Sequence, residues 1–191
     1  MHTLRITILL LFLHLSPFAS GGYDHGTPAG RGNIDIDITI NPGNYFDEGQ
    51  SYLVWGYGIT DNDDFHGYIS HEAGGTDQIY YGWMHRSLSR EWLDLSTAIG
   101  LRHRSGETHT FLPQLLYTFK LPRDYDIGGS IVNVYDITDA ENLGVAYDIM
   151  VRIPVTFDFA QKYFKSLKFT LGLFRSVGGN THPTYSIDMK F

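Results

Sequence analysis

The chain has 191 residues, no cysteine and a formal net charge of −7. An acidic chain is a poor partner for nucleic acid, whose phosphates attract basic surfaces. Without cysteines no disulfide framework can hold the fold, so stability must come from sheet closure and packing. Charged residues make up only 18% of the chain, against about 25% in typical soluble domains. This composition fits one domain with a thin supply of surface charge.

The N-terminus predicts export. Residues 1–21 combine Arg5, an apolar run from Ile6 to Leu15 and small residues at the end, which is the pattern of a signal peptide. The apolar run is too short for a membrane-spanning helix, which needs roughly 20 residues. Residues 22–31 are rich in glycine and predict a flexible N-terminal arm, and residues 32–191 predict one β-barrel domain.

Period-two alternation of apolar and polar residues recurs through residues 32–191, while helical periodicity is scarce. Short polar breaks rich in Gly, Asn and Asp separate the alternating runs, which favours an antiparallel meander. Pro113 predicts a bulge or kink within its strand. We predict ten strands, at residues 32–41, 51–60, 65–72, 77–85, 92–103, 109–121, 127–137, 143–155, 164–176 and 183–191.

The stretch NIDIDITIN, residues 33–41, poses the question of which face meets an oily phase. A soluble lipocalin-like carrier would hold its isoleucines inside, whereas a membrane barrel would turn them outward. The length of the strands favours the membrane barrel over the soluble carrier. The run at 143–155 is roughly 43 Å long at about 3.3 Å per residue, and a tilt near 45° gives it the height of a bilayer's apolar band. Typical soluble strands have about 5 to 6 residues.

The opposite face of the strands mixes small residues with charges of both signs. A narrow barrel needs small groups inside, and charges shielded from water must be paired. We therefore expect acids and bases to pair across the interior, which gives a lumen that is plugged or conducts poorly. The predicted lumen charges are Asp35, Asp37, Asp94, Arg102, Asp148, Arg152, Lys168, Asp188 and Lys190.

The C-terminus reads YSIDMKF, with alternating Tyr185, Ile187, Met189 and Phe191. It resembles the C-terminal signal strand of bacterial outer-membrane β-barrel proteins, which ends in an aromatic residue. The resemblance implies a Gram-negative outer-membrane location, outer-membrane lipid as surroundings, and the barrel assembly machinery and periplasmic chaperones as partners. The expected fold is all-β, a closed antiparallel up-and-down transmembrane β-barrel of about ten strands, with eight as the alternative.

Both chain ends of such a barrel lie on the periplasmic side, so the loops at residues 42–50, 73–76, 104–108, 138–142 and 177–182 are expected outside the cell. They are all short, which disfavours large surface-binding functions. This topology gathers His71, Glu72, His103, His109 and His182 at one rim. A metal site is possible for such a group, but chance clustering explains it as well, and we expect no metal and no cofactor.

The segment LRHRSGE places His103, Ser105 and Glu107 in phase on one face. It is similar to the His-x-Ser dyad of outer-membrane phospholipase A and of lipid A deacylase, which implies Ser105 as nucleophile, His103 as base and Glu107 as orienting acid. The Asn-Gly that follows the serine in the phospholipase is absent here, and the chain is shorter. The sequence thus favours a structural or interaction role, then a narrow porin-like solute channel, then a lipid hydrolase.

Overall fold

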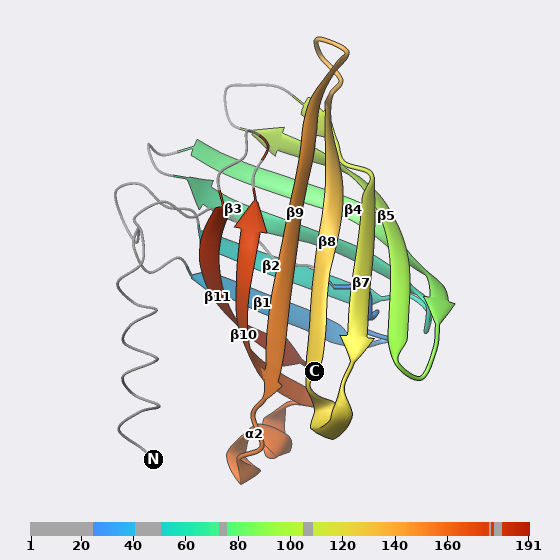
Figure 1. The fold of residues 1–191 in the computed structure, drawn as a ribbon, viewed down its shortest axis with the longest axis vertical. Helices are drawn as coiled ribbons and strands as arrows, with labels where there is room; N and C mark the ends of the chain where they lie inside the picture. Colours follow the sequence, from blue (N-terminus) through green and yellow to red (C-terminus); the bar gives the residue numbers. More distant parts are fainter. Residues whose placement is uncertain (1–24, 41–50, 73–75, 105–108, 176, 178–180) are drawn as a thin grey trace.

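A computed structural model describes residues 25–40, 51–72, 76–104, 109–175, 177 and 181–191 (Figure 1). Eleven strand segments form one antiparallel sheet that closes on itself. The strands are β1 (Ile34–Ile40), β2 (Ser51–Gly58), β3 (Asp63–Glu72), β4 (Thr76–Ser89), β5 (Leu93–Arg104), β6 (His109–Phe111), β7 (Gln114–Lys120), β8 (Asp126–Asp136), β9 (Glu141–Pro154), β10 (Ser166–Arg175) and β11 (Thr181–Lys190).

The segments β6 and β7 share one position in the barrel wall, because both pair with β5 on one side and β8 on the other. Leu112 and Pro113 separate them, as expected for a proline that has no N–H for the ladder. The ladder continues around the break, since Leu112 N donates to Gly100 O and Asn133 N donates to Pro113 O. The wall therefore has ten positions, which confirms ten strands over eight, and the kink at Pro113.

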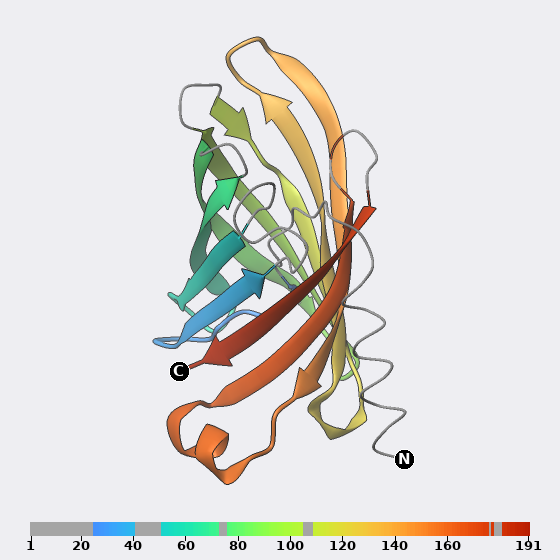
Figure 2. The ribbon, with the colours of Figure 1, turned by 90° about the vertical axis from the view of Figure 1, so that its left-hand side faces the viewer.

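The barrel closes between the first and last strands. In β1 and β11, Asp37 pairs with Asp188 and Ile38 with Ile187, and Phe191 N donates to Ile34 O just beyond the ladder. Figure 2 shows β11 (dark red) beside β1 (blue). Closure leaves no sheet edge, which a membrane would otherwise penalise by several kcal/mol per unpaired backbone group.

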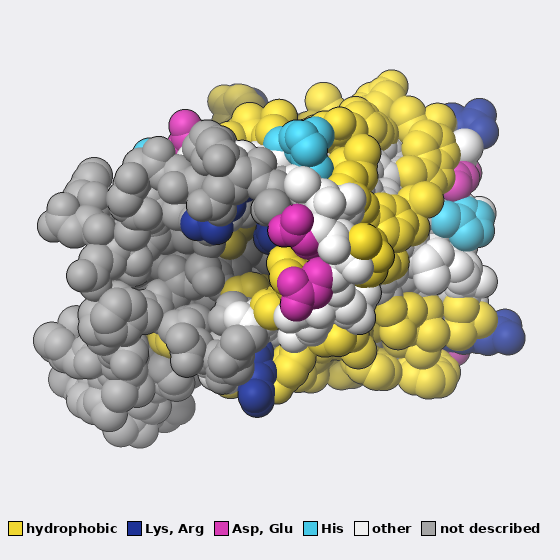
Figure 3. Space-filling model, turned by 90° about the horizontal axis from the view of Figure 1, so that it is seen from above, with side chains coloured by type: hydrophobic (Ala, Val, Ile, Leu, Met, Phe, Trp, Pro, Cys, Tyr) yellow, Lys and Arg dark blue, Asp and Glu magenta, His cyan; other side chains and the backbone are white. Residues whose placement is uncertain are grey.

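Apolar side chains face outward along the wall. Ile34 is 45% exposed and Val145 is 50% exposed, whereas the inward-facing Asp94 and Asp188 are 0% and 3% exposed. Hydrophobic side chains (yellow) cover much of the described outer wall in Figure 3. Over residues 33–39 the alternation thus places Ile34 and Ile38 outside and the aspartates inside, and this is the inverse of a soluble barrel. The prediction of a closed transmembrane-type barrel is confirmed.

The two ends of the barrel differ in their connections. One end, which we call the α2 end, carries the short helix α2 (Asp158–Tyr163) between β9 and β10 and the 3-10 turn η1 (Pro122–Asp124) between β7 and β8. Exposed aromatic side chains of Phe157 and Tyr163 lie there. Among the described residues, no helix is long and apolar enough to span a bilayer. Of the loops expected outside the cell, 138–142 is described at the opposite end, whereas residues 42–50, 73–75, 105–108 and 178–180 lie outside the described residues.

Candidate functional site: the lumen and the segment that crosses it

Four neighbouring strands contribute the first charge cluster of the lumen. Arg152 on β9 forms ion pairs with Asp188 on β11 and with Asp126 on β8, where the N–O distance is 3.2 Å. Lys168 on β10 forms an ion pair with the same Asp126. The strand registers explain this gathering, because Asp126 lies opposite Arg152 and Lys168 lies opposite Asp188. We call Asp126, Arg152, Lys168 and Asp188 the wall network.

Asp94 on β5 centres a second cluster on the other side of the lumen. Its fully buried carboxylate accepts from Lys120 Nζ at 2.8 Å, from Ser89 Oγ at 2.7 Å and from Thr27 Oγ1 at 2.9 Å. Arg86 adds a longer contact at 3.8 Å. Thr27 belongs to the N-terminal part of the chain, so this Asp94 cluster includes a group that is not part of the barrel wall.

The remaining predicted lumen charges point inward but find other partners. The structure pairs Asp37 with Thr39 and Ser186, and gives Asp148 the backbone N–H and hydroxyl of Ser130. Arg102 Nε donates to Thr110, Lys190 donates to Pro28 O, and Asp35 lies 3.7 Å from His25. Among the predicted charges, Arg152 and Asp188 form an ion pair with each other.

Two inward carboxylates escaped the sequence analysis. Asp126 lies at the first position of β8, one residue before the predicted strand start. Asp64 lies at the second position of β3, also ahead of its predicted start, and accepts from the backbone N–H of Ala29 at 2.7 Å. Extending the alternation by one or two residues into the flanking turns would have placed both inside.

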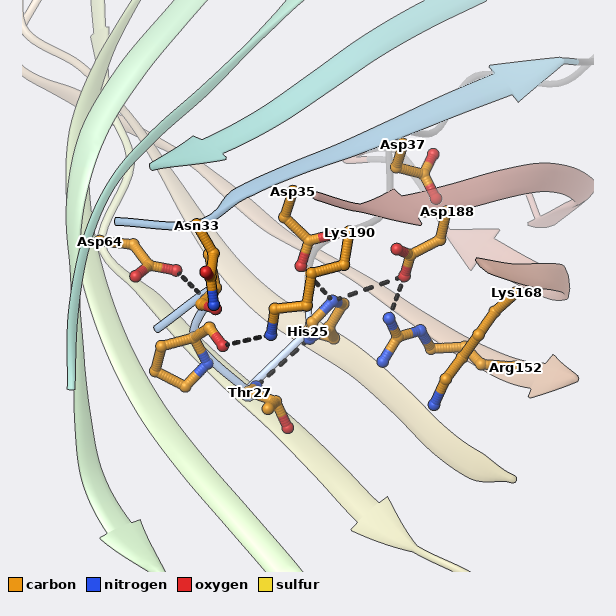
Figure 4. A network of polar contacts seen from close by, with 12 residues as sticks. His25, Thr27, Asn33, Asp35, Asp37, Asp64, Arg152, Lys168, Asp188 and Lys190 are labelled. Carbon is orange, nitrogen blue, oxygen red and sulfur yellow. Dashed lines mark hydrogen bonds and ion pairs between the residues drawn. The ribbon is translucent and has the colours of Figure 1, made fainter. Parts of the chain in front are cut away.

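Residues 25–31 cross the lumen, whereas the sequence predicted a flexible arm there. His25 lies 3.7 Å from both Asp35 and Asp188 (Figure 4). Ser96 Oγ donates to Gly26 O at 2.7 Å, and Lys190 Nζ donates to Pro28 O at 3.1 Å. Together with the contacts of Thr27 and Ala29, these reach β1, β3, β5 and β11. We call residues 25–31 the lumen segment.

Glycines allow the lumen segment to lie directly on the wall. A Cβ at Gly26 would lie 2.8 to 2.9 Å from Tyr117 Cα and from the carbonyl oxygens of Asp94 and Leu116. A Cβ at Gly58 of β2 would meet the backbone of Gly30 at 1.9 Å. Composition alone makes a glycine-rich stretch look like a loose linker. The structure shows that two of these glycines serve close backbone approach.

Three cavities follow one another along the lumen. The cavity at the end opposite α2 has about 100 Å³ and is lined by Tyr52, Tyr68, Tyr80, Arg102 and Gln114, among others. A central cavity of about 30 Å³ follows, and then one of about 250 Å³ at the α2 end. His25 and Thr27 line both the central cavity and the one at the α2 end. The central cavity, beside the lumen segment, is thus the smallest of these three.

The candidate hydrolase group is only partly described. His103 contacts His109 through their Nδ1 atoms at 2.6 Å, and its Nε2 lies 3.0 Å from the Tyr81 hydroxyl. Ser105 and Glu107 lie outside the described residues. Both ring nitrogens of His103 therefore already have partners, and a role as base would require breaking one of these contacts.

The predicted rim of histidines does not form one cluster in the described structure. His71 pairs with Asp77 at 2.6 Å, separately from the His103 and His109 contact. The side chains of Glu72 and His182 lie outside the described residues. Within the ranges described, no group of three or more His, Asp or Glu residues is arranged to hold a metal ion.

Comparison with known proteins gives distant matches in structure alone. No protein-family model and no curated protein sequence matches the chain. The KdgM porin, free and in complex with disordered oligogalacturonate, aligns with a TM-score of 0.49 at 10% identity, over 83% of this chain and 98% of the porin. OccAB2 of Acinetobacter baumannii aligns with a TM-score of 0.31 at 11% identity, over 90% of this chain and 60% of that one.

The structure itself defines the class of protein. A ten-position antiparallel barrel with apolar residues outside and a polar, charged interior is the architecture that spans membranes with strands. The chain has the fold of the outer-membrane β-barrel proteins.

Proposed function

We propose that this protein is a narrow channel for small hydrophilic solutes in a bacterial outer membrane, and that the lumen segment holds it closed. The observation that carries the proposal is the row of three lumen cavities, which is constricted where His25 and Thr27 lie between the second and the third. The closure is placed there because His25 and Thr27 line both the central cavity and the cavity at the α2 end.

The outer wall supports the membrane location. Outward-facing Ile, Leu, Val and aromatic residues form the surface that hydrocarbon would cover, and the C-terminal row Tyr185, Ile187, Met189 and Phe191 lies on that same face. By the topology expected from the sequence, the α2 end faces the periplasm. The lumen segment then closes the periplasmic half of the path.

The interior supports passage of small polar solutes with a preference for cations. The cavities at the two ends of the lumen are lined by residues of both charge signs. The central cavity is lined by Asp35, Asp37, Asp64 and Asp188, and no Lys or Arg is among its described lining residues. Carboxylates at a constriction attract cations, so we expect the open channel to pass small cations more easily than small anions.

The contacts of the lumen segment hold it firmly in the closed position. A typical hydrogen bond contributes about 0.5 to 1.5 kcal/mol net, and about 1.5 to 3 kcal/mol when one partner is charged. The segment makes four such bonds, to Asp64, Asp94, Ser96 and Lys190, and three of these partners are charged. The closed state therefore predominates in the wild type, and opening is best produced by substitutions that prevent the segment from fitting against the wall.

Two substitutions test the closure, one in the lumen segment and one in the barrel wall that the segment contacts. Gly26→Val adds side-chain atoms to the segment where a Cβ already meets wall backbone, and Gly58→Ala adds a Cβ to the wall where the segment's Gly30 lies. Both are expected to expel the segment and raise single-channel conductance in planar bilayers several-fold. Arg31→Ala is the matched control, since Arg31 lies in the same segment with an exposed side chain.

Heat-modifiable migration in detergent checks that every variant folds. Steady, equal conductance in the wild type and in both glycine variants would show that the path is open without release of the segment, which contradicts the closure. Absence of conductance and of solute uptake in all folded variants would reject the channel and leave the structural or interaction role.

A further inference from the structure

The contact between His103 and His109 stands apart from the lumen, on the outer face of the barrel. The two residues pair directly across β5 and β6, near the end opposite α2. Their ring centroids lie 4.5 Å apart in an edge-on arrangement, and their Nδ1 atoms lie 2.6 Å apart. His109 is exposed and His103 is half-exposed, so this pair is open to the surroundings of the barrel.

Two nitrogen atoms in this position are spaced almost as a metal ion needs them. Bonds of about 2.0 Å at the right angle of a square-planar ion place adjacent nitrogens about 2.8 Å apart, and a tetrahedral ion places them about 3.3 Å apart. The present spacing needs to open by only about 0.2 Å in the first case and about 0.7 Å in the second, and both rings must turn so that the Nδ1 lone pairs converge on the ion. The geometry therefore favours a square-planar ion such as Cu²⁺ or Ni²⁺ over Zn²⁺.

The proton that bridges the two Nδ1 atoms does not prevent coordination. A neutral imidazole carries one proton on either nitrogen, so this proton can move to an Nε2 atom of the same ring. Both rings stay neutral, both Nδ1 lone pairs become available, and no proton has to leave the pair. The ring nitrogens that do not bind the ion then carry N–H groups.

Tyr81 is placed to hold one of these rings. Its hydroxyl lies 3.0 Å from His103 Nε2, and its ring stacks on the His103 ring with centroids 5.6 Å apart. Histidines that bind metals almost always donate their other N–H to an acceptor, which fixes the ring and raises its basicity. Tyr81 is thus a positioning residue that orients His103 without binding the ion.

We infer that His103 and His109 form a two-histidine site on the outer face of the barrel that binds Cu²⁺ in preference to Zn²⁺, with water completing the coordination. The ion links β5 to β6 at the last residue pair of their ladder, next to the connection between the two strands. The general affinity order of divalent ions, in which Cu²⁺ exceeds both Ni²⁺ and Zn²⁺, points the same way as the spacing. This site is independent of the channel and of its closure.

The test is a titration of the folded barrel with Cu²⁺, carried out without a polyhistidine tag and followed by electron paramagnetic resonance. The wild type is expected to bind one Cu²⁺ tightly with a two-nitrogen signature. His103→Asn and His109→Asn should each weaken binding by more than about tenfold and remove that signature, because each removes one of two ligands. Tyr81→Phe should weaken binding by roughly tenfold and keep the signature.

His71→Asn is the matched control, because His71 is an exposed outward histidine in a separate pair with Asp77. It is expected to leave the binding and the signature unchanged, and heat-modifiable migration confirms that each variant is folded. A two-nitrogen signal that persists in both His103→Asn and His109→Asn, or no such signal in the wild type, would overturn the inference. Equal affinity for Zn²⁺ and Cu²⁺ would overturn its square-planar part.

Discussion

The wall network and the Asp94 cluster solve the same problem with different parts of the chain. Each buries carboxylates beside basic side chains in a confined lumen. The wall network draws its four members from adjacent strands β8 to β11, so its ion pairs tie the wall to itself. The Asp94 cluster joins β4, β5 and β7 to Thr27 of the lumen segment. The wall network therefore stabilises the barrel wall, whereas the Asp94 cluster also holds the lumen segment in place.

The largest expected effect follows from breaking the wall network at its centre. Arg152→Met leaves Asp188 without its strongest partner and Asp126 with only Lys168. Removing one member of a buried ion pair costs about 3 to 5 kcal/mol, and we expect a loss of that size in the free energy of unfolding. Urea titration in detergent, followed by tryptophan fluorescence, measures it. Addition of Asp188→Asn should recover part of the loss, and an unchanged midpoint would contradict the role of the network.

A smaller loss of stability, together with a leak, is expected when the Asp94 cluster loses its charge. Asp94→Asn keeps the size of the side chain but weakens the contacts with Lys120, Ser89 and Thr27. Loss of charged hydrogen bonds costs about 1.5 to 3 kcal/mol. Unfolding and single-channel recording should both change in this variant. A change in stability with no change in conductance would separate this cluster from closure.

Thr27→Val isolates the link between segment and wall. The variant removes one hydrogen bond to Asp94, which keeps its contacts with Lys120 and Ser89. If the seated lumen segment loses about 1 kcal/mol of stabilisation, the equilibrium between the seated and the released segment shifts roughly fivefold toward release. Open events should therefore become about five times more frequent. The free energy of unfolding should fall by no more than about the same 1 kcal/mol. Recordings indistinguishable from those of the wild type would show that Thr27 does not fasten the segment.

The smallest effect on stability is expected at the end opposite α2. Arg102 donates to Thr110 but, among the described residues, forms no ion pair. Arg102→Gln should change the free energy of unfolding by less than about 0.5 kcal/mol. Combined with Gly26→Val, it should shift the reversal potential of the open channel toward cation preference, since one lumen cation is gone. A large loss of stability would place Arg102 with the wall network instead.

The wall was predictable because a strand in a membrane barrel obeys one rule throughout its length. Alternation fixed ten strand positions, and Pro113 marked the break between β6 and β7. The ends of strands were less predictable, since turn residues and strand residues share Asp and Gly, and Asp64 and Asp126 were missed for that reason. The direction of the apolar face followed from strand length and from the mixed charges opposite it.

Partners within the lumen were beyond sequence reasoning. Asp35, Asp94 and Lys190 contact groups inside the lumen, but their partners depend on which strands meet across the interior and on the lumen segment. Alternation carries no information about contacts across a barrel. The glycines of residues 25–31 looked like linker composition, because only the wall backbone opposite Gly26 and Gly30 reveals why a Cβ is excluded.

The contact between Lys190 and Pro28 joins residues 162 positions apart in the chain. It can form only once the final strand is in place beside the first. Contacts of such long sequence separation are slow to form, so completion of the wall precedes full seating of residues 25–31. A newly assembled barrel should therefore pass through a leaky stage, and the time at which permeability falls would report the last step of its maturation.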